Sequence, residues 1–274
     1  MVLLLRRKVL WREFFLKIFS EKPANEFTKI SLFSPLHFAY LAVIVLIISL
    51  FVFLYFKKEI EKKEKIVNIF AILVLLCYLL DFFFQPFFNG GTMDENGELI
   101  LDKFPFHICT VLCPLIMFSR YSKYKNVIKT PITVLSIVAP LMWLVYPGSA
   151  LDTDCSAFSY EIVQLFMYHG LVFAYGILSL CLEDYKLDIK KCYKEAIFVV
   201  GITLWAAFGN AIYSSSNHDY NWLFIKDPVF DFVPENLNPY IVMLAIYLSC
   251  LVIYGIYYLV VYLYNKKSKN EVAM

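Results

Sequence analysis

Seven long apolar stretches, separated by polar or charged segments, constrain this chain more than any other feature. The first, residues 38–56, runs almost without a polar side chain and ends at Lys57 and Lys58. A helix needs about 20 mostly apolar residues to cross the roughly 30 Å hydrocarbon core of a bilayer. The third stretch is the shortest and the least typical of a full span. The second to seventh stretches cover residues 66–84, 104–119, 127–146, 158–182, 196–213 and 240–264.

The composition also points to a membrane protein. Hydrophobic residues make up 60% of the 274 residues and charged residues 18%, whereas soluble domains average about 45–50% and about 25%. A soluble globule of this length cannot cover so much apolar surface. The composition excludes a disordered chain, a small disulfide-rich secreted protein and a nucleic-acid-binding protein. It predicts an all-α, polytopic membrane bundle of about seven transmembrane helices, with a single domain over residues 35–264 and a polar tail over residues 265–274.

Residues 1–34 differ from the rest of the chain. Trp11, Phe14 and Phe15 fall on one face of a helix, and basic residues lie elsewhere. This pattern predicts an amphipathic helix lying on the membrane surface. A partly ordered basic tail is the alternative. No long apolar core precedes a small-residue cleavage site, so we expect no signal peptide.

The basic residues predict the orientation in the membrane, because Lys and Arg are concentrated in cytoplasmic loops. They crowd the loops after the first, third and fifth stretches and the C-terminal tail. The other three loops hold only Lys103 and Lys226 and are otherwise acidic. We therefore expect a cytoplasmic C-terminus, an external N-terminus and, for so compact a chain, the bacterial plasma membrane. The basic residues of the N-terminal segment argue against an external N-terminus, because they favour the cytoplasmic side. The alternative is a cytoplasmic N-terminus with one span miscounted.

Strongly polar groups inside a span are costly and mark functional sites by default. Few occur here. His107 and Cys109 begin the third stretch, where we expect Pro105 in the first helical turn, and His169 lies about ten residues into the fifth. The predicted topology starts both stretches on the outer side. The remaining polar residues within the stretches or at their edges are His37, Asn68, Asp81, Gln164 and Asn210.

Cys109 and His169 could supply a nucleophile and a base. A thiolate attacks carbonyl carbon, a nearby imidazole takes the thiol proton, and an acyl-thioester results. Backbone N–H groups at the start of a helix could hold the oxyanion. The alternative is that the thiol packs as a small apolar group, as we expect for Cys113, and that polar side chains such as Gln164 and Asn210 join neighbouring helices. The seven cysteines form no CxxC pair and no two histidines have ligand spacing, so neither a disulfide framework nor a metal site is expected.

Four segments, taken in order, resemble one family. They are FSPLH at 33–37, FPFHICT at 104–110, QLFMYHG at 164–170 and NWLFIKDP at 221–228. Together they resemble the YwaF-type bacterial integral membrane proteins and their animal relative, transmembrane protein 164, from about residue 37 to 240. The chain departs from the family pattern at two places. The loop segment at residues 214–219 is longer and more polar than in the pattern, and Trp222 stands where Tyr is expected.

The resemblance implies a seven-span phospholipid acyltransferase. It implies Cys109 as the nucleophile and His169 as the base. A distantly similar group of membrane lipid hydrolases pairs Thr with His, which makes Thr110 the alternative nucleophile. The implied supporting residues are His107 and Asn221, followed by Asn210 and His37.

Three functions follow from these observations. The first is a lipid-directed acyltransferase or hydrolase, with membrane lipids as partners and their acyl chains as substrate, and without a cofactor. The second is a small-solute transporter lined by Gln164, His169 and Asn210, although no inverted repeat or paired broken helices typical of many transporters is evident. The third is a non-catalytic membrane protein. The sequence favours the first and indicates no oligomeric state.

Overall fold

The computed structural model describes residues 28–56, 60–88, 104–151, 155–182, 186–214, 220–228 and 233–272. The predicted surface helix lies almost entirely outside these ranges, as do most of the acidic loop residues. Within them, the sole strand-type pairing is an isolated antiparallel bridge between Lys29 and Ser156. The all-α prediction is confirmed.

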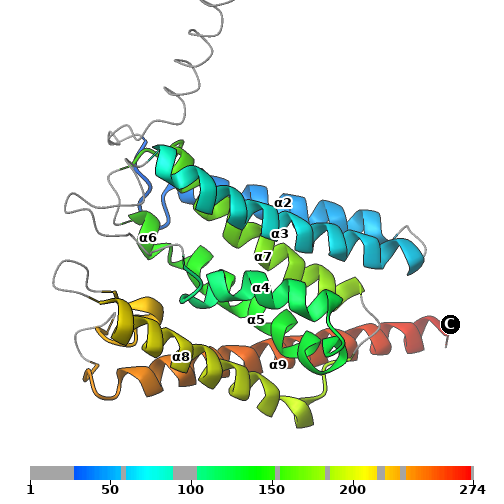
Figure 1. Ribbon diagram of the computed structural model, residues 1–274. Helices are drawn as coiled ribbons and strands as arrows, with labels where there is room; N and C mark the ends of the chain where they lie inside the picture. Colours follow the sequence, from blue (N-terminus) through cyan, green and yellow to red (C-terminus); the bar gives the residue numbers. More distant parts are fainter. Residues whose placement is uncertain are drawn as a thin grey trace, which may run out of the picture. The chain divides into compact units, whose positions relative to one another are not determined.

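Each of the seven apolar stretches forms a helix (Figure 1). Two further short elements are 3-10 helices, η1 (Ile189–Lys191) and η2 (Trp222–Phe224), and α6 (Gly148–Leu151) is a single turn. The main helices are α2 (Pro35–Phe56), α3 (Ile60–Phe88), α4 (Ile108–Tyr121), α5 (Lys125–Val145), α7 (Tyr160–Leu182), α8 (Tyr193–Tyr213) and α9 (Asn238–Val272).

Six of these helices are long and apolar enough to cross a membrane; α4 is the exception. Its 14 residues extend for about 21 Å at 1.5 Å per residue, which is less than the hydrocarbon core. The short length of the third apolar stretch had indicated that this helix differs from a full span. Its apolar side chains are largely buried among other helices, so α4 is stabilised by protein contacts along most of its length.

Several predicted boundaries differ from the structure; α3, for example, begins at Ile60 and not at residue 66. The third helix begins at Ile108 instead of residue 104, so Pro105 precedes the helix and His107 occupies the cap position. The indole N–H of Trp205 donates to the Pro105 carbonyl over 2.7 Å, which fixes this segment as a turn. At the other end, α9 continues to Val272 through the residues expected to form a polar tail.

The described helices fall into two compact units. The first holds residues up to 104 together with 140–174, and the second holds 105–139 together with 175–274, so α5 and α7 contribute to both. The single domain expected from the sequence stays a prediction.

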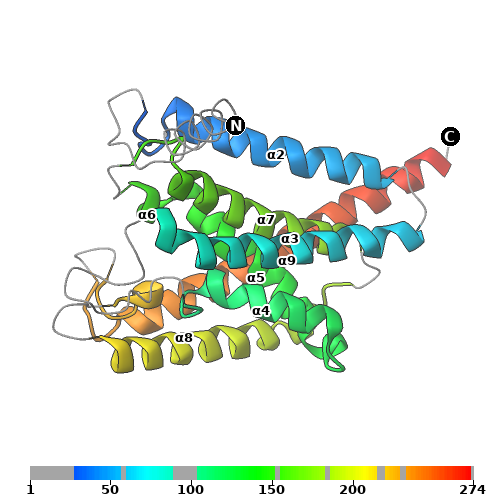
Figure 2. The same cartoon turned by 45° about the horizontal axis from the view of Figure 1, so that its top comes forward.

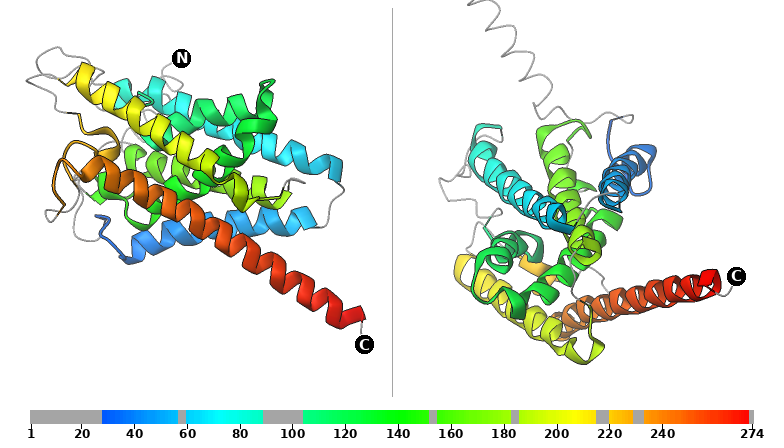
Figure 3. Two further views of the ribbon diagram at one scale, coloured as in Figure 1. Left: turned by 90° about the horizontal axis from the view of Figure 1, so that it is seen from below. Right: turned by 90° about the vertical axis from the view of Figure 1, so that its right-hand side faces the viewer.

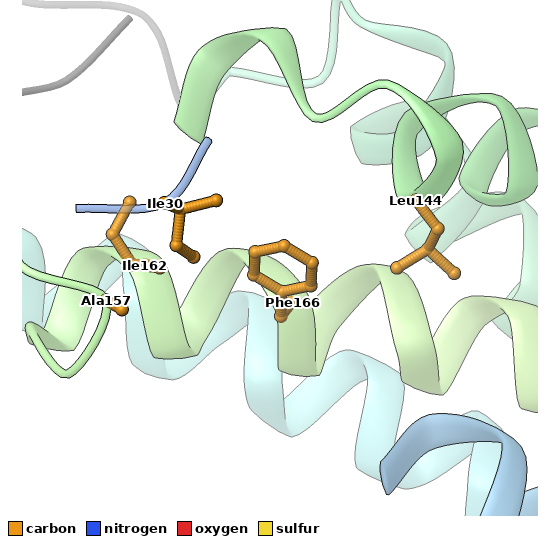
Figure 4. Packing of buried hydrophobic residues seen from close by; sticks show 5 residues of the cluster. All are labelled: Ile30, Leu144, Ala157, Ile162 and Phe166. Atoms are coloured by element: carbon orange, nitrogen blue, oxygen red, sulfur yellow. The ribbon is translucent and has the colours of Figure 1, made fainter. Parts of the chain in front are cut away.

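Aromatic contacts hold the first unit together. Phe51 of α2 meets Phe70 of α3 edge-on, with ring centroids 4.9 Å apart. Tyr40 of α2 stacks on Phe166 of α7 at 4.3 Å, so α2 and α7 lie side by side (Figure 2). Phe166 also belongs to a buried apolar cluster (Figure 4) with Ile30, Leu144, Ala157 and Ile162.

In the second unit, α8 and α9 pack against each other and against η2 (Figure 3). The Tyr254 hydroxyl of α9 donates to the buried Glu195 carboxylate of α8 over 2.9 Å. Elsewhere in this unit α5 and α7 approach closely, because a Cβ on Gly176 would lie 2.9 Å from the backbone nitrogen of Ile137. A glycine is therefore needed at this crossing.

Candidate functional site

His169 is the tenth residue of α7, as the sequence predicted. Its Nδ1 lies 2.7 Å from the carbonyl oxygen of Leu165, one turn earlier in the same helix. A carbonyl oxygen only accepts hydrogen bonds, so Nδ1 carries the proton. In the neutral ring the lone pair is then on Nε2, which is the arrangement that a general base requires.

Aromatic side chains fix the plane of this imidazole. Trp143 of α5 stacks on His169 with ring centroids 3.8 Å apart and an angle of 9° between the planes. Phe166 packs edge-on against Trp143 at 5.1 Å. With only 6% of its surface exposed, His169 lies in an apolar environment that restrains rotation of the ring.

His37, near the start of α2, has a structural role. It is fully buried, and its Nδ1 accepts the Phe33 N–H over 3.1 Å. Nε2 therefore carries the proton and donates it to the Leu144 carbonyl over 2.8 Å. Both ring nitrogens are bonded to backbone, so His37 joins the start of α2 to the end of α5.

Gln164 is also buried on α7. Five residues separate it from His169, which corresponds to about 140° around the helix. The two side chains therefore leave α7 on different faces.

In the second unit, Cys109 is the second residue of α4 and is 8% exposed. The preceding His107 has an extended backbone, and its carbonyl accepts the Val111 N–H over 2.9 Å, which starts the helix. The Thr110 hydroxyl donates to the same carbonyl over 2.9 Å. The His107 side chain does not cap α4; its Nδ1 accepts the Leu223 N–H of η2 over 3.3 Å.

Two asparagines shape the loop that contains η2. The Asn210 amide bonds both backbone groups of Trp222, accepting its N–H over 2.8 Å and donating to its carbonyl over 3.2 Å. Asn221 Oδ1 accepts the N–H groups of Lys226 and Asp227, over 2.9 and 3.2 Å. Asn210 therefore holds the loop that follows its own helix, and the expectation that it joins another spanning helix is wrong.

The backbone of this loop is strained. Leu223 and Phe224 have φ values of 62° and 54°, in the left-handed region that non-glycine residues rarely adopt. The His107 ring holds the Leu223 N–H, and the Asn238 amide donates to the Phe224 carbonyl. Such strain costs about 1–3 kcal/mol per residue and persists only where surrounding contacts impose it.

An aromatic stack lies beneath the loop. The Phe106 ring is 4.6 Å from Trp222 and 5.0 Å from Trp205, between centroids. Gly209 makes room for it, because an added Cβ would lie 2.5 Å from the ring. Phe106 is thereby fixed three residues before Cys109, and this packing locates the start of α4.

Three residues that shape these surroundings were not among the predicted candidates: Trp143, Trp205 and Gly209. Each lies inside an apolar stretch, where tryptophan and glycine are common, so nothing in the local pattern distinguishes them. Among the residues that the structure describes, no three His, Cys, Asp or Glu side chains are grouped to hold a metal ion.

The candidate residues thus fall into two groups. His37, Gln164 and His169 belong to the first unit, and His107, Cys109, Asn210 and Asn221 belong to the second. Within the second group, His107, Asn210 and Asn221 all bind the η2 loop. The pairing of Cys109 with His169 stays a prediction.

Comparison with protein families gives a match. The family model described as the TMEM164 family matches residues 32–264, which is most of the chain. No curated protein and no solved structure matches. The family match confirms the relation to transmembrane protein 164 indicated by the four motifs. This integral membrane protein belongs to the TMEM164 family.

Proposed function

We propose that this protein transfers or hydrolyses acyl groups of membrane lipids, with Cys109 as the nucleophile and His169 as the general base. The observation that carries the proposal is the 2.7 Å contact between Nδ1 of His169 and the Leu165 carbonyl oxygen. The Leu165 carbonyl holds the proton on Nδ1 and leaves the lone pair on Nε2, which is the nitrogen able to accept a proton from a thiol.

The start of α4 favours Cys109 over Thr110. The Thr110 hydroxyl donates its proton to the His107 carbonyl, and this bond must break before the oxygen can transfer that proton to a base. Helix geometry also points the first N–H groups of α4 out of the helix end. Such groups stabilise negative charge on an oxyanion that develops beside them.

The reaction begins when Nε2 of His169 takes the proton from the Cys109 thiol. The thiolate attacks the carbonyl carbon of a lipid ester, and the tetrahedral intermediate collapses with cleavage of the carbon–oxygen bond. The released alcohol, a lysolipid, takes the proton from His169, and the acyl group stays on sulfur as a thioester. A second lysolipid or a water molecule then loses its proton to His169 and attacks the thioester. The carbon–sulfur bond breaks, and the departing sulfur takes the proton from His169, which restores the thiol and the neutral imidazole.

The transport alternative has less support. It needs the Asn210 amide to line a path for solute, whereas both ends of that amide are bonded to the Trp222 backbone. Opening these bonds would release the strained η2 loop.

The experiment uses the full chain in lipid nanodiscs containing a phospholipid and a lysophospholipid. Mass spectrometry follows acyl exchange and looks for an acyl adduct on the peptide that contains Cys109. We expect an adduct that hydroxylamine removes, as a thioester requires. Cys109→Ala abolishes it, and His169→Ala slows its formation by about 10²–10⁴-fold, the usual contribution of a general base.

Cys113→Ala is the matched control, because Cys113 is a second buried thiol one turn further along α4. This variant keeps the wild-type adduct and rate. Activity that survives Cys109→Ala and disappears in Thr110→Val makes threonine the nucleophile. Wild-type protein that gives neither an adduct nor acyl exchange above empty nanodiscs refutes the enzymatic proposal.

A further inference from the structure

An apolar groove of about 230 Å³ lies in the first unit. Side chains of α2, α3 and α7 line it, including Ile44, Phe70 and Met167. Its long walls are α2 and α7, and both are among the helices able to span a membrane.

Contacts between the walls give the direction of the groove. Tyr40 of α2 stacks on Phe166 of α7, and one turn further along both helices Ile44 lies against Gly170. The two helices therefore run in the same direction and in register. The groove continues to Ile48 on α2, a length of about 12 Å from Tyr40 at 1.5 Å per residue.

The lining offers no strong hydrogen-bonding group to an occupant. Tyr40 is the one lining residue with a hydroxyl, amide or charge, and its hydroxyl donates to the Ala157 carbonyl. Apolar cavities of comparable size stay free of water and bind hydrocarbons. The occupant that complements this groove is therefore a hydrocarbon.

We infer that the groove binds a fatty acyl chain of a membrane lipid. A helix from a partner or a second copy would lie over the groove and not within it, because a cylinder about 10 Å wide and 12 Å long fills on the order of 900 Å³. An added Cβ on Gly170 would lie 2.9 Å from Ile44, so the two walls touch at this level. A single extended acyl chain is much narrower than a helix and brings no polar group among these apolar side chains.

Two aromatic rings connect the groove to His169. Phe166 contacts Tyr40 on one side and Trp143 on the other, and Trp143 stacks on His169. The chain-binding inference does not need any chemistry. That the bound chain belongs to the acyl substrate rests on the proposed function.

Val43 and Val45 provide a matched pair for the test. Both lie on α2 with similar exposure, 53% and 56%, but only Val43 lines the groove. Val43→Trp fills the groove, whereas Val45→Trp adds the same side chain to the opposite face of α2. Because both positions are exposed, neither substitution disturbs the buried packing.

The probe is a phosphatidylcholine with a photoreactive diazirine in one acyl chain, and the protein is Cys109→Ala in nanodiscs, so no turnover interferes. Mass spectrometry maps the labelled residues. We expect labelling of Met167 that excess unlabelled phosphatidylcholine suppresses. Val43→Trp lowers this labelling about tenfold, as expected from displacing two methylene groups of the chain, and Val45→Trp does not change it.

A free fatty acid carrying the same diazirine distinguishes the source of the chain. Equal labelling by both probes supports recognition of the chain itself. Labelling by the phospholipid alone supports binding of an esterified chain. Labelling of Met167 that resists competition, or that both tryptophan variants leave unchanged, overturns the inference. In that case an acyl adduct on Cys109 in the wild type would still support the proposed function. Labelling of the groove without any adduct on Cys109 would support the acyl-chain site and refute the proposed function.

Discussion

Replacing Gly209 with alanine tests the packing that locates the start of α4. The new Cβ would lie 2.5, 2.7 and 2.8 Å from Cδ1, Cγ and Cε1 of Phe106. Carbon atoms pack best at about 3.5–4.0 Å, so the ring has to move by about 1 Å. Trp205 and Trp222 contact the ring, and the bond to the Pro105 carbonyl fixes the preceding residue. Little space is left for this movement.

Gly201 on the same helix supplies the control, because no atom lies within 4 Å of a Cβ built there. Alanine is better than glycine in a helix by about 0.5–1 kcal/mol at either position. Overpacking costs about 1–3 kcal/mol and applies only at Gly209. The difference between the two variants isolates this cost, which is roughly 2–12 °C in unfolding midpoint at about 2–4 °C per kcal/mol.

The measurement is thermal unfolding in one detergent, followed by tryptophan fluorescence. We expect a lower midpoint for Gly209→Ala than for Gly201→Ala. Phe106→Leu shortens the opposing side chain, so in a double-mutant cycle it should recover part of the loss in the Gly209→Ala background. Equal midpoints for the two alanine variants, or additive effects in the cycle, refute the reasoning.

Four further measurements test other parts of the structure. His37→Ala removes two hydrogen bonds of about 1 kcal/mol each, so the midpoint should fall by roughly 4–8 °C; an unchanged midpoint contradicts its structural role. Nitrogen-15 NMR of labelled histidines, assigned with His→Gln variants, should show opposite neutral tautomers, with the proton on Nε2 in His37 and on Nδ1 in His169; matching tautomers contradict the hydrogen bonds. Asn210→Ala should increase proteolysis at residues 220–228, because the Trp222 backbone loses its two side-chain bonds, whereas Thr203→Ala, which loses a bond only to its own helix, should not. A C-terminal fluorescent protein should fluoresce and a C-terminal alkaline phosphatase should be inactive, since we expect this end in the cytoplasm; the reverse pattern inverts the predicted orientation.

The sequence predicted the helices well because their main determinant is local. Each long apolar stretch needs a hydrocarbon environment, and a helix satisfies its own backbone groups there. The positions of His37 near the start of α2 and of His169 ten residues into α7 follow directly. The start of α4 was harder to predict from the sequence, because proline is compatible with a first helical turn. Only the contact of the Pro105 carbonyl with Trp205 shows that this residue lies outside the helix.

The surroundings of the candidate residues depend on contacts between distant parts of the chain. His107 bonds the backbone of Leu223, 116 positions away, and nothing near either residue encodes this contact. The left-handed conformations of Leu223 and Phe224 contradict local preference and need Asn210, Asn238 and His107 together. The role of Trp143 depends on its stacking against His169, a contact between two helices that no local pattern encodes.

The bond between His169 and Leu165 has a consequence for how substitutions act on this residue. Its acceptor is a main-chain oxygen one turn away in the same helix, so the position of the proton is encoded within five consecutive residues of α7. Exchange of the Leu165 side chain preserves the acceptor. The helix turn therefore supplies the acceptor for this proton whatever side chain stands at position 165. Stacking with Trp143 of α5 keeps the ring in the plane that reaches this acceptor, so a substitution of Trp143 is the change in another helix that can alter the tautomer.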